Sequence, residues 1–133
     1  MTYINKSSNI YDDAQIGKDC SIGAFVEIQN VTIGDRSRIG AGSFIPDNVN
    51  IGKDVFVGPH VVFTNDKRPP SHGQWKNDPP TIVEDNVAIG ANSTILPSLT
   101  LGKGCVIGAG SVVTKSVNPG EIVYGNPAKS KKI

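Results

Sequence analysis

The chain has 133 residues and a formal net charge of +1 at pH 7, which leaves room for one domain with a single core. The near-balanced charge argues against a nucleic-acid partner and against binding to anionic lipid. Residues 1–13 lack a cationic segment followed by an apolar one, and no apolar run approaches the length of a bilayer span. We therefore expect a soluble, cytoplasmic protein with neither a membrane nor a nucleic acid as partner.

Aliphatic residues recur every six positions along most of the chain. The positions are Ile10, Ile16, Ile22 and Ile28, then, after a one-residue slip, Ile33, Ile39, Ile45, Ile51, Val57 and Phe63, and after an interruption Val83, Ile89, Ile95, Leu101, Ile107 and Val113. The helical period of 3.6 and the strand period of two do not produce this spacing. A triangular solenoid with six-residue sides does, so we predict an all-β fold whose coils stack at the strand spacing of roughly 4.8 Å.

A second position, four places after each aliphatic residue, carries small or branched side chains that would fit an inner corner of the coil. It is occupied by Cys20, Val26, Ser37, Ser43, Val49, Val55, Val61, Val87, Ser93, Leu99, Cys105, Ser111 and Val117. The only two cysteines belong to this set. We interpret both as buried thiols, because two distant cysteines form neither a disulfide framework nor a zinc site.

Residues 64–82 interrupt the repeat with a polar, proline-rich segment. We predict an excursion loop within a single domain of residues 1–133, followed by a coenzyme-binding tail at 118–133. Long ordered loops are usually functional. The single tryptophan, Trp75, lies in this loop, and we expect it to contact substrate or a neighbouring subunit. Packing against its own solenoid is the alternative.

Several segments resemble the hexapeptide-repeat acetyltransferases. The closing IVYGNPAK and the stretch GANSTILPSLTLGKGCVIGAGSVVTKSV resemble the coenzyme half of that family, and the resemblance covers nearly the whole chain. VFVGPHVVFTNDKRPPS with PTIVEDNVAIGANSTILP is similar to N-acetyltransferases acting on nucleotide-linked amino sugars, notably those of the dTDP-3-amino-3,6-dideoxyhexose type.

This resemblance implies a left-handed parallel β-helix, an exception to the right-handed rule for parallel crossovers. It also implies acetyl-coenzyme A as acyl donor, no metal, direct attack in a ternary complex, a homotrimer with sites between subunits, and a place in lipopolysaccharide O-antigen biosynthesis. The chain ends within a few residues of the NPAK motif. Whether it acts alone or corresponds to part of a larger enzyme is left open.

An eighteen-residue coil, with fourteen residues inserted by the loop, places Gly42, His60, Asn92 and Gly110 in one column. Acyl transfer to an amine requires an unprotonated nitrogen, and histidine titrates near neutral pH. We therefore predict His60 as general base or hydrogen-bond partner of the amine, with a structural histidine as the alternative. Some relatives need no protein base, which makes Asn65 the other candidate catalytic residue.

Two sets of residues are expected to bind ligands. The acceptor set comprises Asn65, Asp66, Lys67, Arg68 and Trp75, although Asn and Asp also favour turns and the two cations could be solvated. The coenzyme set comprises Gly90, Ala91, Asn92, Ala109, Lys115, Asn126, Pro127 and Lys129. Within it, Ala91 and Ala109 are eighteen apart and would stack, leaving the backbone open to the pantetheine arm.

Three other functions compete with this hypothesis. A sugar or serine O-acetyltransferase would use the same fold and donor. A non-catalytic prism, such as an ice-binding or scaffold protein, would need a flat and regular face. A γ-type carbonic anhydrase would need three histidines on a metal, whereas the chain contains only His60 and His72.

Overall fold

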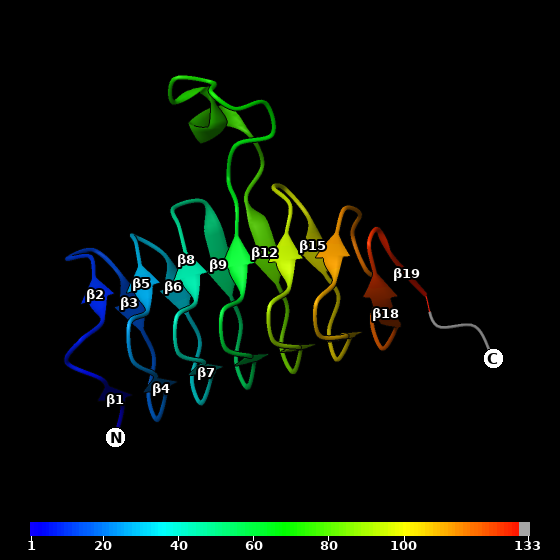
Figure 1. Cartoon of the computed structure of the whole chain (residues 1–133). Helices are drawn as coiled ribbons and strands as arrows, with labels where there is room; N and C mark the ends of the chain where they lie inside the picture. The colour runs from blue at the N-terminus through cyan, green and yellow to red at the C-terminus, as the bar shows by residue number, and fades with distance from the viewer. Residues whose placement is uncertain (131–133) are drawn as a thin grey trace.

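The chain winds into a three-sided solenoid of very short strands from which one loop projects (Figure 1). The computed structural model describes residues 1–130. β1 and β19, the first and last strands, lie at opposite ends of the solenoid. Within residues 1–130, no helix has the length and apolar content that a bilayer crossing requires.

Each side of the solenoid is one sheet, and successive coils add one strand to each sheet. Sheet A contains β1 (Tyr3–Ile4), β4 (Ser21–Ile22), β7 (Arg38–Ile39), β10 (Phe56–Val57), β13 (Ala88–Ile89), β16 (Val106–Ile107), β18 (Ile122–Gly125) and β19 (Ala128–Ser130). Sheet B contains β2 (Asn9–Ile10), β5 (Glu27–Ile28), β8 (Phe44–Ile45), β11 (Val62–Phe63), β14 (Thr94–Ile95) and β17 (Val112–Val113). Sheet C contains β3 (Gln15–Ile16), β6 (Thr32–Ile33), β9 (Val49–Ile51), β12 (Thr81–Val83) and β15 (Thr100–Leu101).

The strand register confirms the repeat. Pairing is parallel throughout except between β18 and β19, which form an antiparallel hairpin. Val57 pairs with Ile39, eighteen positions earlier. Ile51 pairs with Val83, thirty-two positions later, so the excursion inserts fourteen residues and leaves the register unchanged. The predicted left-handed parallel β-helix is confirmed, and the solved structures described below share this fold.

The aliphatic positions and the inner-corner positions together fill the interior. Ile22, Ile45 and Ile95 are fully buried, and so are both cysteines to within 2%. The inner-corner serines are buried as well, and their hydroxyls join adjacent coils. The Ser43 hydroxyl, for example, donates to the Gly58 carbonyl at 2.9 Å and accepts from the Val61 amide at 3.1 Å. These polar groups therefore satisfy one another inside an apolar core.

Backbone conformation is uniform at the corners of the coil. The third residue after the inward aliphatic has a positive φ at Asp19, Phe25, Arg36, Gly42, Asn48, Asp54, His60, Asn86, Asn92, Ser98, Gly104, Gly110 and Gly120. Glycine, asparagine and aspartate tolerate this left-handed region best. Bulky side chains are uncommon in this region and often occur at functional sites. Two of these thirteen corner residues, Phe25 and His60, have an aromatic ring.

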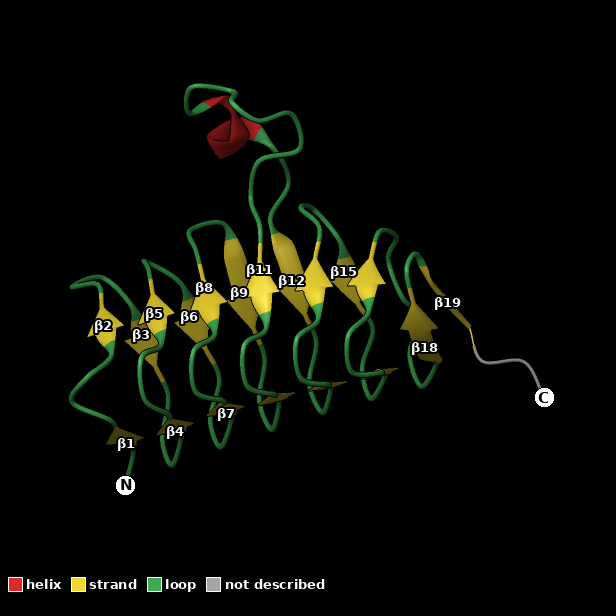
Figure 2. Cartoon of the chain, viewed as in Figure 1, coloured by secondary structure: helices red, strands yellow, loops and turns green. Residues whose placement is uncertain are grey.

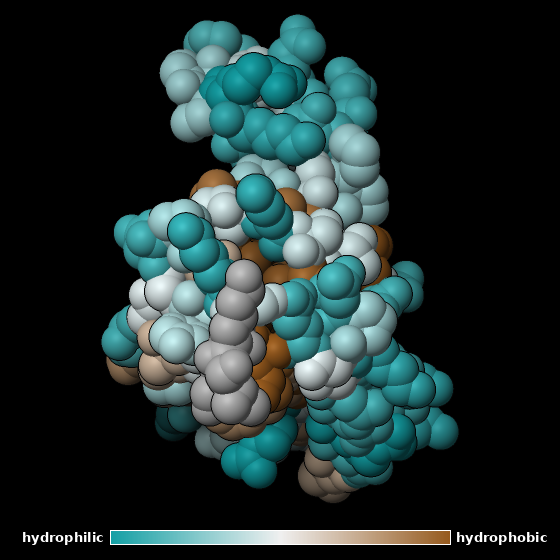
Figure 3. Space-filling model, turned by 90° about the vertical axis from the view of Figure 1, so that its right-hand side faces the viewer, coloured by the Kyte–Doolittle hydropathy of each residue, from teal (hydrophilic) through white to brown (hydrophobic). Residues whose placement is uncertain are grey.

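The excursion leaves sheet B after β11 and rejoins the solenoid at β12 (Figure 2). Thr81 and Ile82 fall inside the predicted 64–82 range but belong to β12, so the loop ends at residue 80. Thr81 pairs with Val49 and is buried. The loop contains one short 3₁₀ helix, η1 (Gln74–Asn77). Figure 3 shows a largely hydrophilic loop surface standing clear of the prism.

The C-terminal tail begins as solenoid and ends as the β18–β19 hairpin. Val117 bridges to Leu101, so the start of the predicted 118–133 tail continues directly from a coil. β18 then pairs with β16 on sheet A. Residues 131–133 of the predicted tail lie outside the described part of the chain.

Candidate functional site

The corner that joins sheet A to sheet B, called the A/B corner below, carries the predicted column. Gly42, His60, Asn92 and Gly110 occupy successive levels of it. The His60 amide donates to the Ala41 carbonyl at 2.8 Å, and the Asn92 amide donates to the Pro59 carbonyl at 3.0 Å. The structure therefore places His60 and Asn92 on adjacent coils, as the spacing predicts.

Gly42 determines where the His60 imidazole lies. A Cβ atom built on Gly42 would stand 2.4 Å from Cε1 and 2.5 Å from Nδ1 of His60, far inside van der Waals contact. The ring therefore folds over the glycine, toward the N-terminal coils. His60 is exposed, and among the described residues no hydrogen bond holds either ring nitrogen. Both nitrogens are open to a ligand.

Four of the predicted coenzyme residues, Gly90, Ala91, Asn92 and Ala109, lie on the same corner, on the C-terminal side of His60. The Gly110 amide donates to the Ala91 carbonyl at 2.8 Å, which confirms the stacking of these coils. Position 90 also requires glycine for packing, because a Cβ atom there would lie 2.5 Å from the Ala109 nitrogen. Short side chains thus form a smooth track along this edge.

The remaining coenzyme candidates gather near the C-terminal end. Lys115, Pro127 and Lys129 line one hollow of about 290 Å³ between the last coil and the β18–β19 hairpin. Asn126 is exposed at the turn of that hairpin. Gly125, directly before it, donates its amide to Ser111 at 3.2 Å. The hairpin turn therefore continues the track, about three coil spacings (roughly 14 Å) from His60.

The predicted acceptor residues lie at the corner between sheets B and C, the B/C corner, where the loop leaves the solenoid. Asn65 and Asp66 line a hollow of about 390 Å³, together with apolar walls from Phe44 and Pro69. Asn65 donates its amide to the Asp47 carbonyl at 3.1 Å. This bond fixes the side chain and leaves its Oδ1 as an acceptor.

Asp66 organises the loop itself. Its Oδ2 accepts the Ser71 amide at 2.9 Å, and its Oδ1 accepts the Arg68 amide at 3.1 Å. The Ser71 amide is the main cause that lowers the pKa of this carboxyl below its ordinary value. Both oxygens are thus already engaged by the loop backbone.

The other loop candidates are spread over its surface. Lys67 is exposed, and Arg68 forms a long ion pair with Asp78, at 3.8 Å. Trp75 lies half-buried in η1 with the Lys76 ammonium 5.8 Å from its ring centroid. The contact of Trp75 with a substrate or neighbour stays a prediction.

The two catalytic candidates, His60 and Asn65, are close in sequence but lie at opposite edges of sheet B. The extended strand β11 separates them. Five residues of fully extended chain would span at most roughly 16 Å. Since His60 and Asn65 lie at different corners of the coil, we expect that within one subunit they do not contact the same reacting atom.

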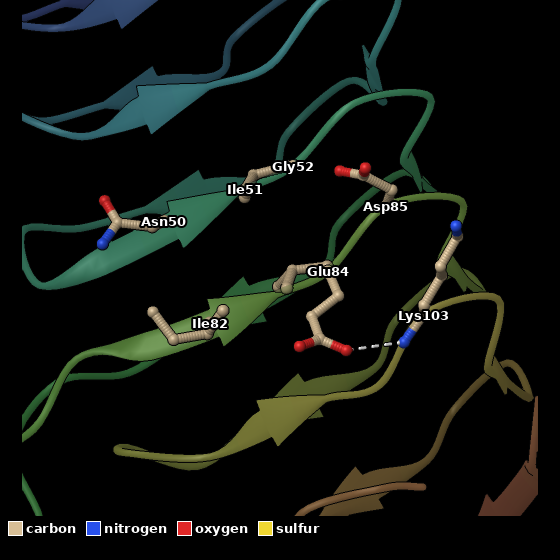
Figure 4. A pocket seen from close by; sticks show the side chains of 8 residues that line it. Asn50, Ile51, Gly52, Ile82, Glu84, Asp85 and Lys103 are labelled. Carbon is tan, nitrogen blue, oxygen red and sulfur yellow. Dashed lines mark hydrogen bonds between the residues drawn. The ribbon is translucent and has the colours of Figure 1, made fainter. Parts of the chain in front are cut away.

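A further hollow of about 440 Å³ lies over sheet C and the corner between sheets C and A (Figure 4). Its two acidic side chains are engaged by backbone amides. Glu84 accepts the Lys103 amide at 2.9 Å, and Asp85 accepts the Lys53 amide at 2.8 Å. None of the predicted site residues lines this hollow. Its polar groups brace the coils.

The described residues contain no cluster of metal-binding side chains, and the Cys105 thiol is not activated. Among residues 1–130, no group of three or more His, Cys, Asp or Glu side chains is arranged to hold a metal ion. Burial raises the pKa of the Cys105 thiol to about 11, so this thiol stays protonated at neutral pH.

Two family models match the chain. The hexapeptide repeat of succinyl-transferase matches residues 80–115, and the bacterial transferase hexapeptide (six repeats) matches residues 30–65. Both stretches of the solenoid therefore carry the hexapeptide repeat of these transferases. These matches confirm the resemblance to the hexapeptide-repeat acetyltransferases.

Curated relatives include the bifunctional protein GlmU of Wigglesworthia glossinidia brevipalpis, 36% identical, and that of Thermodesulfovibrio yellowstonii, 40% identical. Each alignment covers 86% of this chain, but only 23% and 24% of the relative. The chain thus spans about a quarter of the length of these curated relatives.

Solved structures share the fold over nearly the whole chain. AntD, an N-acyltransferase from Bacillus cereus in complex with dTDP and 3-hydroxybutyryl-CoA, has a TM-score of 0.85 at 25% identity, covering 98% of this chain and 79% of AntD. A mutant of GDP-perosamine N-acetyltransferase from Caulobacter crescentus, in complex with CoA and GDP-perosamine, has a TM-score of 0.85 at 22% identity, covering 99% and 57%.

Proposed function

We propose that the chain is an acyl-coenzyme A-dependent N-acyltransferase that modifies the amino group of a nucleotide-linked sugar. The observation that carries the proposal is the A/B corner: an exposed histidine with open ring nitrogens stands at the end of a track of small residues. The track, from His60 past Ala91 and Ala109 to Asn126, suits an elongated donor. AntD, with bound dTDP and an acyl-CoA, supports both ligand classes.

His60 is the proposed proton acceptor. The sugar nitrogen attacks the thioester carbonyl, the C–N bond forms as the C–S bond breaks, and the products are an amide and the free thiol of coenzyme A. His60 accepts the proton that the nitrogen loses and returns it to the departing thiolate. Asn65 Oδ1 accepts a hydrogen bond from the amine or a sugar hydroxyl.

A homotrimer completes this site because His60 and Asn65 come from opposite edges of sheet B. The outward side chains of sheets A and B support such contacts. In the C-terminal part of the prism, the outward ladder of sheet A runs through Phe56, Ala88, Val106 and Ile122, and that of sheet B through Phe44, Val62, Thr94 and Val112. Sheet C instead carries mostly polar outward residues, Gln15, Thr32, Asn50, Ile82 and Thr100.

Parallel sheets are normally covered on both faces. Phe56 and Ile122 are nevertheless 46% and 45% exposed in the single chain. In the proposed homotrimer a second subunit packs against these two faces and covers them. The cytoplasmic location and the role in O-antigen biosynthesis stay predictions.

Thiol release from acetyl-coenzyme A tests the proposal directly. The acceptor panel contains dTDP-, UDP- and GDP-linked amino sugars, with their hydroxyl analogues, serine and simple galactosides as controls. Release with an amino sugar and none with its hydroxyl analogue is expected. Release only with hydroxyl acceptors would replace N-transfer by O-transfer, and failure of acetyl-coenzyme A to bind would favour a non-catalytic prism.

A further inference from the structure

The outer face of sheet A changes character along the prism. Its four C-terminal ladder positions are apolar, but the next position toward the N-terminus is Arg38, which pairs in register with Phe56 on one side and Ser21 on the other. Arg38 is exposed, and no ion pair engages it in the described part of the chain. Arg36, by contrast, is bound by Asp54 at 2.8 and 3.0 Å.

Arg38 lies in a hollow of about 270 Å³ beside the A/B corner. Phe56 and Pro59 form its apolar walls, and Pro59 directly precedes His60. A guanidinium in a partly apolar hollow is well suited to a phosphate, because its planar fork donates two parallel hydrogen bonds and it loses little hydration on binding.

Phe25 lies on the same corner, in the column of His60 and two coils before it. Its side chain is 76% exposed, and its φ is +56°. An exposed phenylalanine gains no core burial, and a positive φ is an unfavourable backbone conformation for a bulky residue. Neither packing within the chain nor backbone preference explains this residue. A flat, accessible ring at this place is a stacking surface.

We infer that the nucleoside diphosphate of the acceptor lies on the N-terminal side of His60, with the diphosphate on Arg38 and the base against Phe25. This inference rests on the proposed function, in which the donor occupies the C-terminal side of His60 and leaves this side to the acceptor. Phe25 and His60 are about 10 Å apart by the coil spacing, a separation that a nucleoside diphosphate can bridge. Arg38 lies between them along the prism.

Titration calorimetry with dTDP, UDP and GDP tests the inference on the intact chain, together with the kinetics of thiol release. Arg38→Gln is expected to weaken the tightest-binding nucleotide at least tenfold and to leave the KM for acetyl-coenzyme A unchanged. Lys103→Gln, which removes an exposed cation at another corner, is the matched control and should bind like the wild type.

The variant Phe25→Asn distinguishes a role of Phe25 in nucleotide binding from a role in folding. Asparagine tolerates a positive φ, so this variant should melt no lower than the wild type while nucleotide affinity falls severalfold. A lower melting temperature would make Phe25 a structural residue and overturn its assignment.

The outcomes for this inference and for the proposed function differ. If the wild type binds a nucleotide and Arg38→Gln binds it equally well, the inference is wrong and the proposed function stands. If the wild type acylates free amino sugars as well as nucleotide-linked ones, the inference is wrong while acyl transfer stands. If it binds no nucleotide and acylates nothing, both fall.

Discussion

Mixing two inactive variants tests whether the site is shared between subunits. His60→Asn removes the proton acceptor, and Asn65→Ala removes the amide at the loop exit. Each variant alone should lose at least tenfold in turnover, in keeping with the usual contribution of a general base. Because the two side chains lie at opposite edges of sheet B, the proposed site takes His60 from one subunit and Asn65 from its neighbour.

The cyclic symmetry of a trimer determines how much turnover a mixture of the two variants should recover. In a mixed trimer of the two variants, a subunit with intact His60 faces a neighbour with intact Asn65 at one of the three interfaces, whichever variant is in excess. Mixed trimers isolated through two different tags should therefore recover about one third of wild-type turnover. Thiol release measures this recovery.

The controls make the outcome decisive. Each variant is carried through the same co-expression with a differently tagged copy of itself, which should give no recovery. Mixed trimers that form in good yield but stay at the level of the single variants would refute the shared site. Both residues would then have to act within one subunit, contrary to their separation by β11.

Three further predictions follow from single contacts. His60→Asn alone should keep its melting temperature, since asparagine accepts a positive φ, so lost turnover with an unchanged melting curve would identify a chemical role. Gly90→Ala should lower the melting temperature by several degrees, because its Cβ would lie 2.5 Å from the Ala109 nitrogen; an unchanged melting curve would show that the coils can separate freely. The lowered pKa of Asp66 means that its contribution to loop order is full above the ordinary aspartate pKa of about 3.9 and is lost as pH falls through the lower folded value. Trp75 fluorescence should report that loss, and Asp66→Asn should remove it; an identical acid transition in both proteins would contradict this role of Asp66.

The sequence was sufficient for the repeat and its register. Counting alone placed Asn92 beside His60, because an eighteen-residue coil leaves little freedom once the length of the insertion is known. The sequence pattern placed the end of the loop two residues too late, at residue 82, because Thr81 is polar and follows two prolines. The signal was available: Thr81 stands two residues before Val83, as Val49 stands two before Ile51, and the two residues pair.

The site was harder to predict than the fold. The sequence indicated His60 and Asn65 as two candidate catalytic residues but not their separation, and β11 places them at opposite edges of sheet B. The packing of the His60 imidazole over Gly42 could not be predicted from the sequence. A glycine at this corner is already explained by its positive φ. Ligand-binding roles for individual residues depend on side-chain direction and on neighbouring subunits, which a repeat pattern does not encode.

The excursion departs after β11 and returns at β12 without disturbing the pairing of the coils before and after it. The loop is therefore an exchangeable part: a loop of different length or composition could replace it while the A/B corner keeps its spacing. Acceptor preference could change by substitution of one surface segment, with the acyl-donor track left intact. Because Asn65 lies at the start of the loop, such an exchange would keep the donor track but would have to retain Asn65.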